Sequence, residues 1–244
     1  MQSIDFTGRT VFVAGGSSGI GNGIARAFRA QNAQVHVCGT RKSAADYEGE
    51  EGSELAGMTY YQLDVCDDDA IASFIPAFST LDVLVCAQGI ALYKRAEFGM
   101  EGFRQVMDVN LNSVMALSLK FQPMLEAARG SAIFVNSGAG FKAMIGNPGY
   151  GASKGGLRIL TMSLAEAWAP HVRVNAIAPG FVETRITKVT RDHPQRYEAT
   201  LGNIPLKRWG TVDEMGGIAL FLASDLASYI TGQTIFADGG KILS

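Results

Sequence analysis

A glycine-rich segment near the start of the chain is the strongest indicator of its fold: Thr10-Val-Phe-Val-Ala-Gly-Gly-Ser-Ser-Gly-Ile-Gly21. Its first five residues lack the polar alternation of a half-exposed strand, which predicts a strand buried on both faces. Spaced glycines follow at once, and Gly19–Ala30 continues with apolar residues at helical spacing. Glycines alone would fit any tight turn. Placed between a first strand and a helix, they favour a nucleotide site, where backbone N–H groups and the helix dipole hold a diphosphate.

Short apolar runs and longer helical patterns alternate along the rest of the chain. Strands are predicted at Thr10–Ala14, Val35–Cys38, Met58–Leu63, Leu81–Ala87, Ala132–Asn136, Val172–Ile177 and Thr234–Ala237. Helices are predicted at Gly19–Ala30, Val106–Ala128, Gly149–Trp168 and Asp213–Leu222. This alternation predicts an α/β fold, a doubly wound parallel sheet with helices on both faces, formed by residues 1–244 as a single domain.

Two segments fit this pattern poorly. Arg41–Gly57 mixes four glutamates with glycines, and we expect a solvated loop with room for one helical turn. Residues 184–210 are long, polar and interrupted by Pro194 and Pro205, and such loops are usually substrate-binding segments or lids. The basic residues of this loop would attract an anionic substrate, although a solvated loop explains them equally well.

Composition excludes several classes of protein. The chain has 244 residues, 21 Lys and Arg against 23 Asp and Glu, and a formal net charge of −2, which argues against a nucleic-acid partner. There is no apolar run of about 18 residues and no basic start followed by an apolar stretch, so we expect no membrane partner and a cytoplasmic location. The cysteines show no metal-ligand spacing and are expected to be buried, reduced thiols, with no metal site: Cys38, Cys66 and Cys86.

Tyr150 and Lys154 lie four residues apart at the start of a predicted helix and therefore share one face. A free tyrosine has a pKa of about 10 and is a poor base at neutral pH. A nearby ammonium favours the phenolate, so Lys154 is expected to lower the pKa of Tyr150 and make it a usable acid or base. An exposed helix face would explain the pair equally well when it is taken alone.

Two further polar residues, Ser137 and Asn110, favour a functional interpretation of the Tyr150 and Lys154 pair. Ser137 follows the fifth strand at the carboxyl edge of the sheet, where ligands of α/β proteins bind. Asn110 lies in an apolar helical stretch, where a buried amide demands partners. Each residue has an ordinary alternative, a helix cap for Ser137 and a satisfied core amide for Asn110. Together with the glycine turn they predict a reaction site.

The ordered set of motifs resembles the short-chain dehydrogenase/reductase family over essentially the whole chain. The motifs are Gly15–Gly21, Asp64-Val65, Asn110, Ser137, Tyr150 with Lys154, Asn175-Ala-Ile-Ala-Pro179-Gly180, Thr184 and Asp238-Gly239-Gly240. The resemblance implies a Rossmann-type domain that interconverts a secondary alcohol and a ketone by hydride transfer with NAD(P). Its substrates would be small carbonyl compounds such as 3-oxoacyl groups or polyols.

The same resemblance implies a role for each residue. Tyr150 would be the proton donor and acceptor, and Ser137 would stabilise charge on the substrate oxygen. Lys154 would also bind the nicotinamide ribose, and Asn110 would hold a water of the proton path. The implied cofactor-binding residues are Gly15, Ser17, Ser18, Gly19, Ile20, Gly21, Thr40, Arg41, Asp64, Val65, Ala87, Gly89, Tyr150, Lys154, Pro179, Gly180, Val182 and Thr184.

The chain departs from the family pattern at two places. Ala14 stands where the family usually has Thr before the first glycine, so one structural hydrogen bond is lost. The segment Cys86-Ala87-Gln88-Gly89 replaces the usual Asn-Asn-Ala-Gly, and the roles of those asparagines do not transfer. Neither departure touches the Asn, Ser, Tyr and Lys set.

The end of the second predicted strand bears on the choice of cofactor. Relatives that prefer NAD carry an acid there, which binds the ribose hydroxyls and repels a 2′-phosphate. Here Gly39 holds that position and Thr40, Arg41 and Lys42 follow, so we expect NADP(H) rather than NAD(H). Ser18, where many NADP users carry a basic residue, argues the other way, and Arg41 and Lys42 would also suit the start of a solvated loop.

The apolar faces of two predicted helices bear on the assembly of the chain, and the Tyr150 and Lys154 pair bears on whether it is an enzyme. The helices Val106–Ala128 and Gly149–Trp168 carry apolar residues on more than one face, which predicts a homotetramer or a homodimer. The alternative to an enzyme is a non-catalytic relative that binds a dinucleotide as a sensor or scaffold. Such a protein has no need for Tyr150 and Lys154 on one face opposite Ser137.

Overall fold

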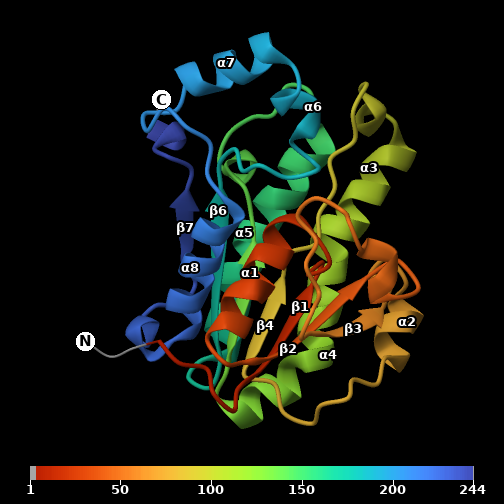
Figure 1. Cartoon of the computed structure of the whole chain (residues 1–244), viewed down its shortest axis with the longest axis vertical. Coiled ribbons are helices and arrows are strands. Elements are labelled where there is room, and N and C mark those ends of the chain that lie inside the picture. Colours follow the sequence, from red (N-terminus) through yellow and green to blue (C-terminus); the bar gives the residue numbers. More distant parts are fainter. Residues whose placement is uncertain (1–3, 244) are drawn as a thin grey trace.

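The computed structural model describes residues 4–243. Its centre is a seven-stranded parallel sheet in the order β3-β2-β1-β4-β5-β6-β7 (Figure 1). The strands are β1 Thr10–Ala14, β2 Gln34–Gly39, β3 Thr59–Gln62, β4 Val83–Cys86, β5 Ser131–Val135, β6 Arg173–Pro179 and β7 Thr234–Ala237. The chain order reverses between β1 and β4, the position at which doubly wound sheets open a crevice at their carboxyl ends. The predicted sheet architecture is confirmed.

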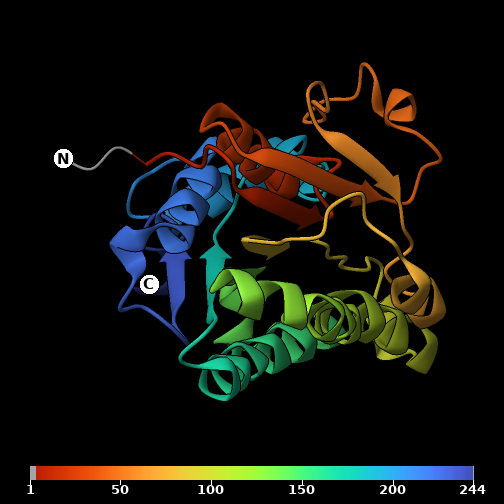
Figure 2. The same ribbon diagram turned by 90° about the horizontal axis from the view of Figure 1, so that it is seen from below.

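Helices cover both faces of this sheet. Helices α1 Gly19–Ala30 and α8 Val212–Ala223 lie on one face, and α4 Ser113–Ala128 and α5 Pro148–Trp168 lie on the other (Figure 2). Phe12 and Val13, neighbours in β1, belong to the cores on opposite faces, and both are fully buried. This double burial explains why the strands read as continuous apolar runs.

Shorter elements complete the described chain. The short α-helices are α2 Asp68–Ser73, α3 Met100–Met107, α6 Lys188–Arg191 and α7 Pro194–Gly202. Turns of 3-10 helix are η1 Ala44–Tyr47, η2 Ala96–Phe98, η4 Gly138–Gly140, η5 Asp225–Ala227 and η6 Lys241–Leu243, and a π-helical turn, η3, spans Asp108–Asn112. Within residues 4–243, no helix combines the length and the apolar character needed to cross a membrane.

The structure corrects three sequence-based expectations. The helix expected at Val106–Ala128 is divided by the π-helical turn into α3 and α4. Residues 184–210 are not an open loop, because α6 and α7 lie within them. Cys66 is exposed rather than buried, while Cys38 and Cys86 are buried as predicted. The Arg41–Gly57 segment forms the single helical turn η1, as expected.

Candidate active site

The glycine turn between β1 and α1 lies in close contact with the backbone of the loop after β4. Gly15 has φ +71°, and a Cβ there would lie 2.7 Å from the backbone nitrogen of Gln88, so a side chain does not fit. Ser18, the N-cap residue of α1, makes no side-chain capping bond, and the first turn of this helix carries no acid. Such an N-terminus favours an anion, so this end of α1 fits a diphosphate.

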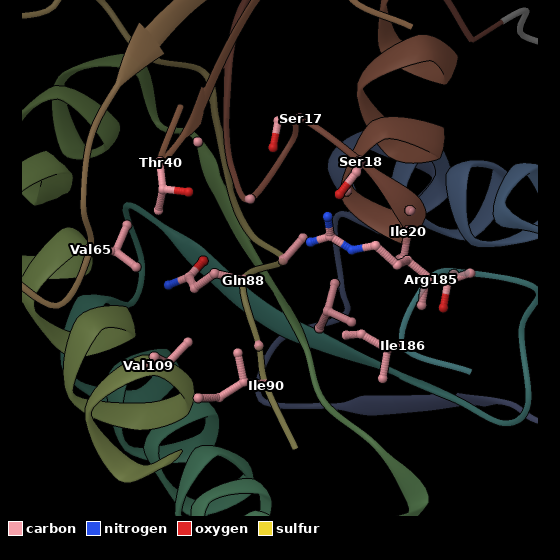
Figure 3. A pocket seen from close by; sticks show the side chains of 18 of the residues that line it. Ser17, Ser18, Ile20, Thr40, Val65, Gln88, Ile90, Val109, Arg185 and Ile186 are labelled. Atoms are coloured by element: carbon pink, nitrogen blue, oxygen red, sulfur yellow. The ribbon is translucent and has the colours of Figure 1, made fainter. Parts of the chain in front are cut away.

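Beside this turn, a cavity of about 480 Å³ lies at the carboxyl ends of the strands (Figure 3). The structure places all eighteen predicted cofactor-binding residues in its wall. They are Gly15, Ser17, Ser18, Gly19, Ile20, Gly21, Thr40, Arg41, Asp64, Val65, Ala87, Gly89, Tyr150, Lys154, Pro179, Gly180, Val182 and Thr184. Ser137 lines the same cavity. The residues present therefore fit an elongated dinucleotide, with carboxylate and hydroxyl groups at one end and the tyrosine and lysine at the other.

The β5 end and the start of α5 bring three predicted catalytic residues together. Ser137 follows β5, and its hydroxyl lies near enough to the Tyr150 phenol to lower the pKa of that group. Lys154, one helical turn after Tyr150, is buried and donates from Nζ to the carbonyl oxygen of Val135 at 2.7 Å. The hydroxyl, the phenol and the ammonium therefore meet at one end of the cavity.

Asn110 lies behind the cavity wall rather than in it, and it is fully buried. The π-helical turn carries it, and such turns often mark functional sites because they redirect one side chain. Its Oδ1 accepts the Ile90 N–H at 2.8 Å, and its Nδ2 donates to the Ile90 carbonyl and to Ser153 Oγ. A Cβ added at Gly89 would lie 3.5 Å from Asn110 Oδ1 and 3.7 Å from Lys154 Nζ. The amide and the ammonium thus face the same small space.

Burial is the largest influence on the pKa values of Tyr150 and Lys154. Burial raises the pKa of the Tyr150 phenol, the hydrogen bond with Ser137 lowers it, and the charge of Glu97 raises it further. Burial also lowers the pKa of Lys154 to about 8. The Lys154 ammonium lies 5.9 Å from the centre of the Tyr150 ring, but the pKa of the phenol is set chiefly by burial. The expectation that Lys154 brings the pKa of Tyr150 below its ordinary value is therefore wrong for this structure, and the phenol is protonated at neutral pH.

At the opposite end of the cavity, Gly39 ends β2 and Arg41 follows it. A Cβ at Gly39 would lie 2.6 Å from the Tyr47 hydroxyl and 2.7 Å from Ser17 Oγ, so an acidic side chain there would have to displace both groups. The Arg41 guanidinium lies over the Tyr47 ring, 4.4 Å from its centre, and pairs with Glu50 at 2.5 Å. This ion pair raises the pKa of Arg41. No sequence pattern indicates that Arg41 has a carboxylate partner in the loop.

Gln88 is a cavity residue that sequence reasoning passed over. Its side chain reaches into the cavity between Thr40, Val65 and Val109 (Figure 3). Nε2 donates to Ser113 Oγ at 2.8 Å, and Ser113 donates its own proton to the Val109 carbonyl. The amide orientation is therefore fixed, and Oε1 has no hydrogen-bond partner among the described residues. The only sequence signal was the departure from the family's usual Ala at this position.

The segment that leads into α6 borders the cavity. Arg185 and Ile186 line the cavity, and the Arg185 side chain reaches into it (Figure 3). The Tyr93 hydroxyl donates to the Ile186 carbonyl at 2.7 Å, which ties this segment to the loop after β4. Arg191, in α6, forms two hydrogen bonds with Glu51 in the loop between β2 and β3, at 3.0 and 3.2 Å. Hydrogen bonds from two other loops therefore hold this part of the chain in place.

Comparison with known proteins agrees with this geometry. The family model described as enoyl-(acyl carrier protein) reductase matches residues 14–241. The chain is 38% identical over 251 residues to 2-dehydro-3-deoxy-D-gluconate 5-dehydrogenase of Pseudoalteromonas atlantica, with 98% of each chain covered. It is 35% identical over 243 residues to 3-oxoacyl-[acyl-carrier-protein] reductase of Chlamydia trachomatis, with 95% of this chain and 96% of that one covered.

A solved structure shows the same likeness in three dimensions. The Pseudomonas aeruginosa RhlG/NADP active-site complex superimposes with a TM-score of 0.88 at 29% identity, covering 98% of both chains. The chain belongs to the short-chain dehydrogenase/reductase family. It is an oxidoreductase that uses NAD(P).

Proposed function

We propose that this enzyme interconverts a secondary alcohol and a ketone, with Tyr150 as the proton donor and acceptor. The observation that carries the proposal is the convergence of Ser137, Tyr150 and Lys154 at one end of a cavity whose other end suits an adenosine. A protein that only binds a dinucleotide has no need for a buried phenol beside a serine hydroxyl and a buried ammonium.

Each side chain has one task in this mechanism. The nicotinamide of the cofactor supplies or accepts the hydride. Ser137 donates a hydrogen bond to the substrate oxygen and stabilises the charge that develops on it. Tyr150 gives its phenolic proton to that oxygen during reduction and takes it back during oxidation. Lys154 holds a positive charge in the site, and Asn110 orients a water beside it.

The test is turnover over a panel of ketones and alcohols, followed by absorbance at 340 nm, with cofactor affinity measured in parallel. Catalysis with at least one carbonyl class is the expected outcome. Tight cofactor binding without turnover on any member of the panel would favour the alternative, a dinucleotide-binding sensor or scaffold.

We propose small carbonyl substrates, either 3-oxoacyl groups or polyols and related sugar derivatives. The support is divided, because one relative acts on a deoxy sugar acid and the other on an acyl-carrier ketone. Residues 184–210 serve as the substrate lid, since Ile186 and Arg185 lie in the cavity wall. Comparing the two classes in the same panel decides between them.

We propose NADP(H) as the preferred cofactor. Gly39 carries no acidic side chain that would repel a 2′-phosphate, and Thr40 and Arg41 line the cavity next to it. One structural neighbour is an NADP complex. The test compares kcat/KM for NADPH and NADH in the parent and in Arg41→Ala. A parent preference for NADH, or an unchanged ratio in the variant, would overturn the proposal.

We further propose that the enzyme is a cytoplasmic homo-oligomer, a tetramer or a dimer, formed from one domain. The support for assembly is an outer face of α4 and α5 that keeps large apolar side chains exposed: Leu119, Ile159 and Met162. Light scattering at micromolar concentration tests this state, and a monomeric mass would contradict it.

A further inference from the structure

Glu97 is a buried acid that the mechanism above does not use. It lies in η2, between β4 and α3, and is only 1% exposed. Oε1 accepts hydrogen bonds from the Leu92 N–H and from Asn147 Nδ2, each at 2.8 Å. Oε2 accepts the Tyr150 N–H at 2.8 Å. The carboxylate is therefore held by three N–H donors, one from the loop after β4 and two from the start of α5.

Two of these donors belong to the start of α5, the helix that carries Tyr150 and Lys154. Asn147, its N-cap residue, makes no side-chain capping bond to the helix, and its amide instead donates to Glu97 and to the Leu92 carbonyl. Glu97 thus takes over the capping of α5 from 53 residues away in sequence. The positive end of a long helix favours a carboxylate, and charge-assisted bonds offset its burial.

The Glu97 carboxylate packs closely enough against α5 to fix the position of its first turn. A Cβ added at Gly149 would lie 3.3 Å from Glu97 Oε2, so the carboxylate lies directly against the first turn of α5. The bond to the Leu92 N–H also fixes the loop whose Tyr93 hydroxyl holds the lid at Ile186. One carboxylate therefore joins the catalytic helix to the loop that faces the substrate.

We propose that Glu97 is a positioning residue for the proposed reaction: it fixes the first turn of α5 so that the Tyr150 phenol faces Ser137. This inference rests on the proposed function. A shift of about 1 Å in a reacting group can lower a rate by about a hundredfold, so loss of one carboxylate far from the substrate is expected to reduce turnover.

The charge of Glu97 gives the proposal a second readout. Glu97 and Tyr93 each raise the pKa of Tyr150 in addition to burial, and Ser137 lowers it. The Lys154 ammonium, on the same helix as Tyr150, lies 5.9 Å from the centre of the ring. Removal of the negative charge therefore lowers the pKa of Tyr150, and the alkaline loss of reductase activity moves to lower pH.

The test is Glu97→Gln, which keeps the shape but turns an NH₂ group toward N–H donors. We expect kcat for reduction to fall about 10-fold to 100-fold, KM for the cofactor to stay within about twofold, and the alkaline limb of the kcat profile to shift to lower pH. Glu97→Asp keeps the charge, and its alkaline limb is expected to remain at the parent pH. Glu101→Gln, an exposed acid on α3, is the matched control and should behave as the parent.

The outcomes separate the two proposals. A parent enzyme that reduces no carbonyl would refute the proposed function, whereas an active parent with an unchanged Glu97→Gln profile would refute the role of Glu97. Equal losses of kcat and cofactor affinity in both Glu97 variants, with no shift of the profile, would also overturn it, because that pattern marks general destabilisation. If Glu97→Gln does not fold, Glu97→Asp tests the positioning role, because it keeps the charge but withdraws the carboxylate from the Tyr150 N–H. A lower kcat with an unchanged cofactor KM supports the proposal, and a parent-like kcat refutes it.

Discussion

Tyr150 is the residue on which the proposed reaction depends most directly. Burial raises the pKa of its phenol above the ordinary value, which favours the protonated form required to donate a proton. Tyr150→Phe removes only the proton carrier, so kcat should fall by about 10²–10⁴ while cofactor affinity, measured by protein fluorescence, stays near that of the parent. Tyr229→Phe, at a fully exposed tyrosine, is the control. Activity within a few-fold of the parent would refute the role of Tyr150.

Lys154 gives a prediction about stability as well as function. Burial lowers its pKa from 10.5 to about 8, so the charged ammonium is disfavoured by folding. The unfolded chain holds this proton more tightly, and this group therefore makes stability rise as pH increases from about 8 to 10.5. Lys154→Met is expected to raise the free energy of unfolding at pH 7 by about 1–3 kcal/mol, after allowance for the lost bond to Val135.

The same variant should lose turnover and bind the cofactor more weakly. Denaturant unfolding at pH 7 and pH 10 measures the stability effect, which should shrink at the higher pH. A Lys154→Met variant that is less stable than the parent at pH 7 would show that the ammonium is fully compensated in the fold.

The sequence predicts functional residues that lie a few positions apart in one motif. It does not predict residues whose partners are far away in the sequence. Tyr150 and Lys154 are four residues apart, so their shared face is readable from spacing. Glu97 lies 53 residues from its partner Tyr150, and no local pattern links them. The direction of the Tyr150 pKa shift could not be predicted from the sequence either, because burial, its largest cause, is a property of the folded chain.

At the scale of single elements, the loop between β2 and β3 carries the next prediction. Glu50 pairs with Arg41 at 2.5 Å and would compete with a 2′-phosphate for its guanidinium. Glu50→Gln should therefore raise the ratio of kcat/KM for NADPH to that for NADH by about threefold to tenfold. Stability should change little, since partly exposed ion pairs contribute about 0–1 kcal/mol.

The control for this variant is Glu48→Gln, an exposed acid in the same loop. Steady-state kinetics with both cofactors on one accepted ketone supply the measurement. A fall in the ratio would mean that Glu50 does not restrain Arg41 and that the carboxylate has another role in the loop.

The elements themselves show where sequence patterns stop. Buried strands and the long helices α1 and α5 were predictable because apolar periodicity persists over many residues. Helices α6 and α7 have no buried residues, so the sequence contains no apolar stripe from which they could be predicted. The π-helical turn at Asp108–Asn112 lies inside a continuous apolar pattern and depends on the contacts of Asn110 with Ile90 and Ser153.

At the scale of the whole molecule, α4 and α5 form an outer layer on one face of the sheet (Figure 2). Leu119 on α4 is 55% exposed, and Ile159 on α5 is 56% exposed. Helices that bury one side against the sheet and keep such residues on the other are typical of an interface between subunits. A stable pair of subunits buries about 800 Å² on each partner, an area that two helices of this length can supply.

A charge placed in this layer should therefore reduce the size of the assembly. Ile159→Asp would bury a carboxylate without a partner between subunits, and burying an unpaired charge costs free energy of association. The mass measured by light scattering at micromolar concentration should therefore fall to that of a smaller species. Ile75→Asp is the matched control, since Ile75 is 87% exposed in the segment between α2 and β4, away from both helices. The parent and the control should keep the same oligomeric mass. If Ile159→Asp also keeps it while remaining folded, the α4 and α5 layer is not the interface, and the exposed apolar residues there need another explanation.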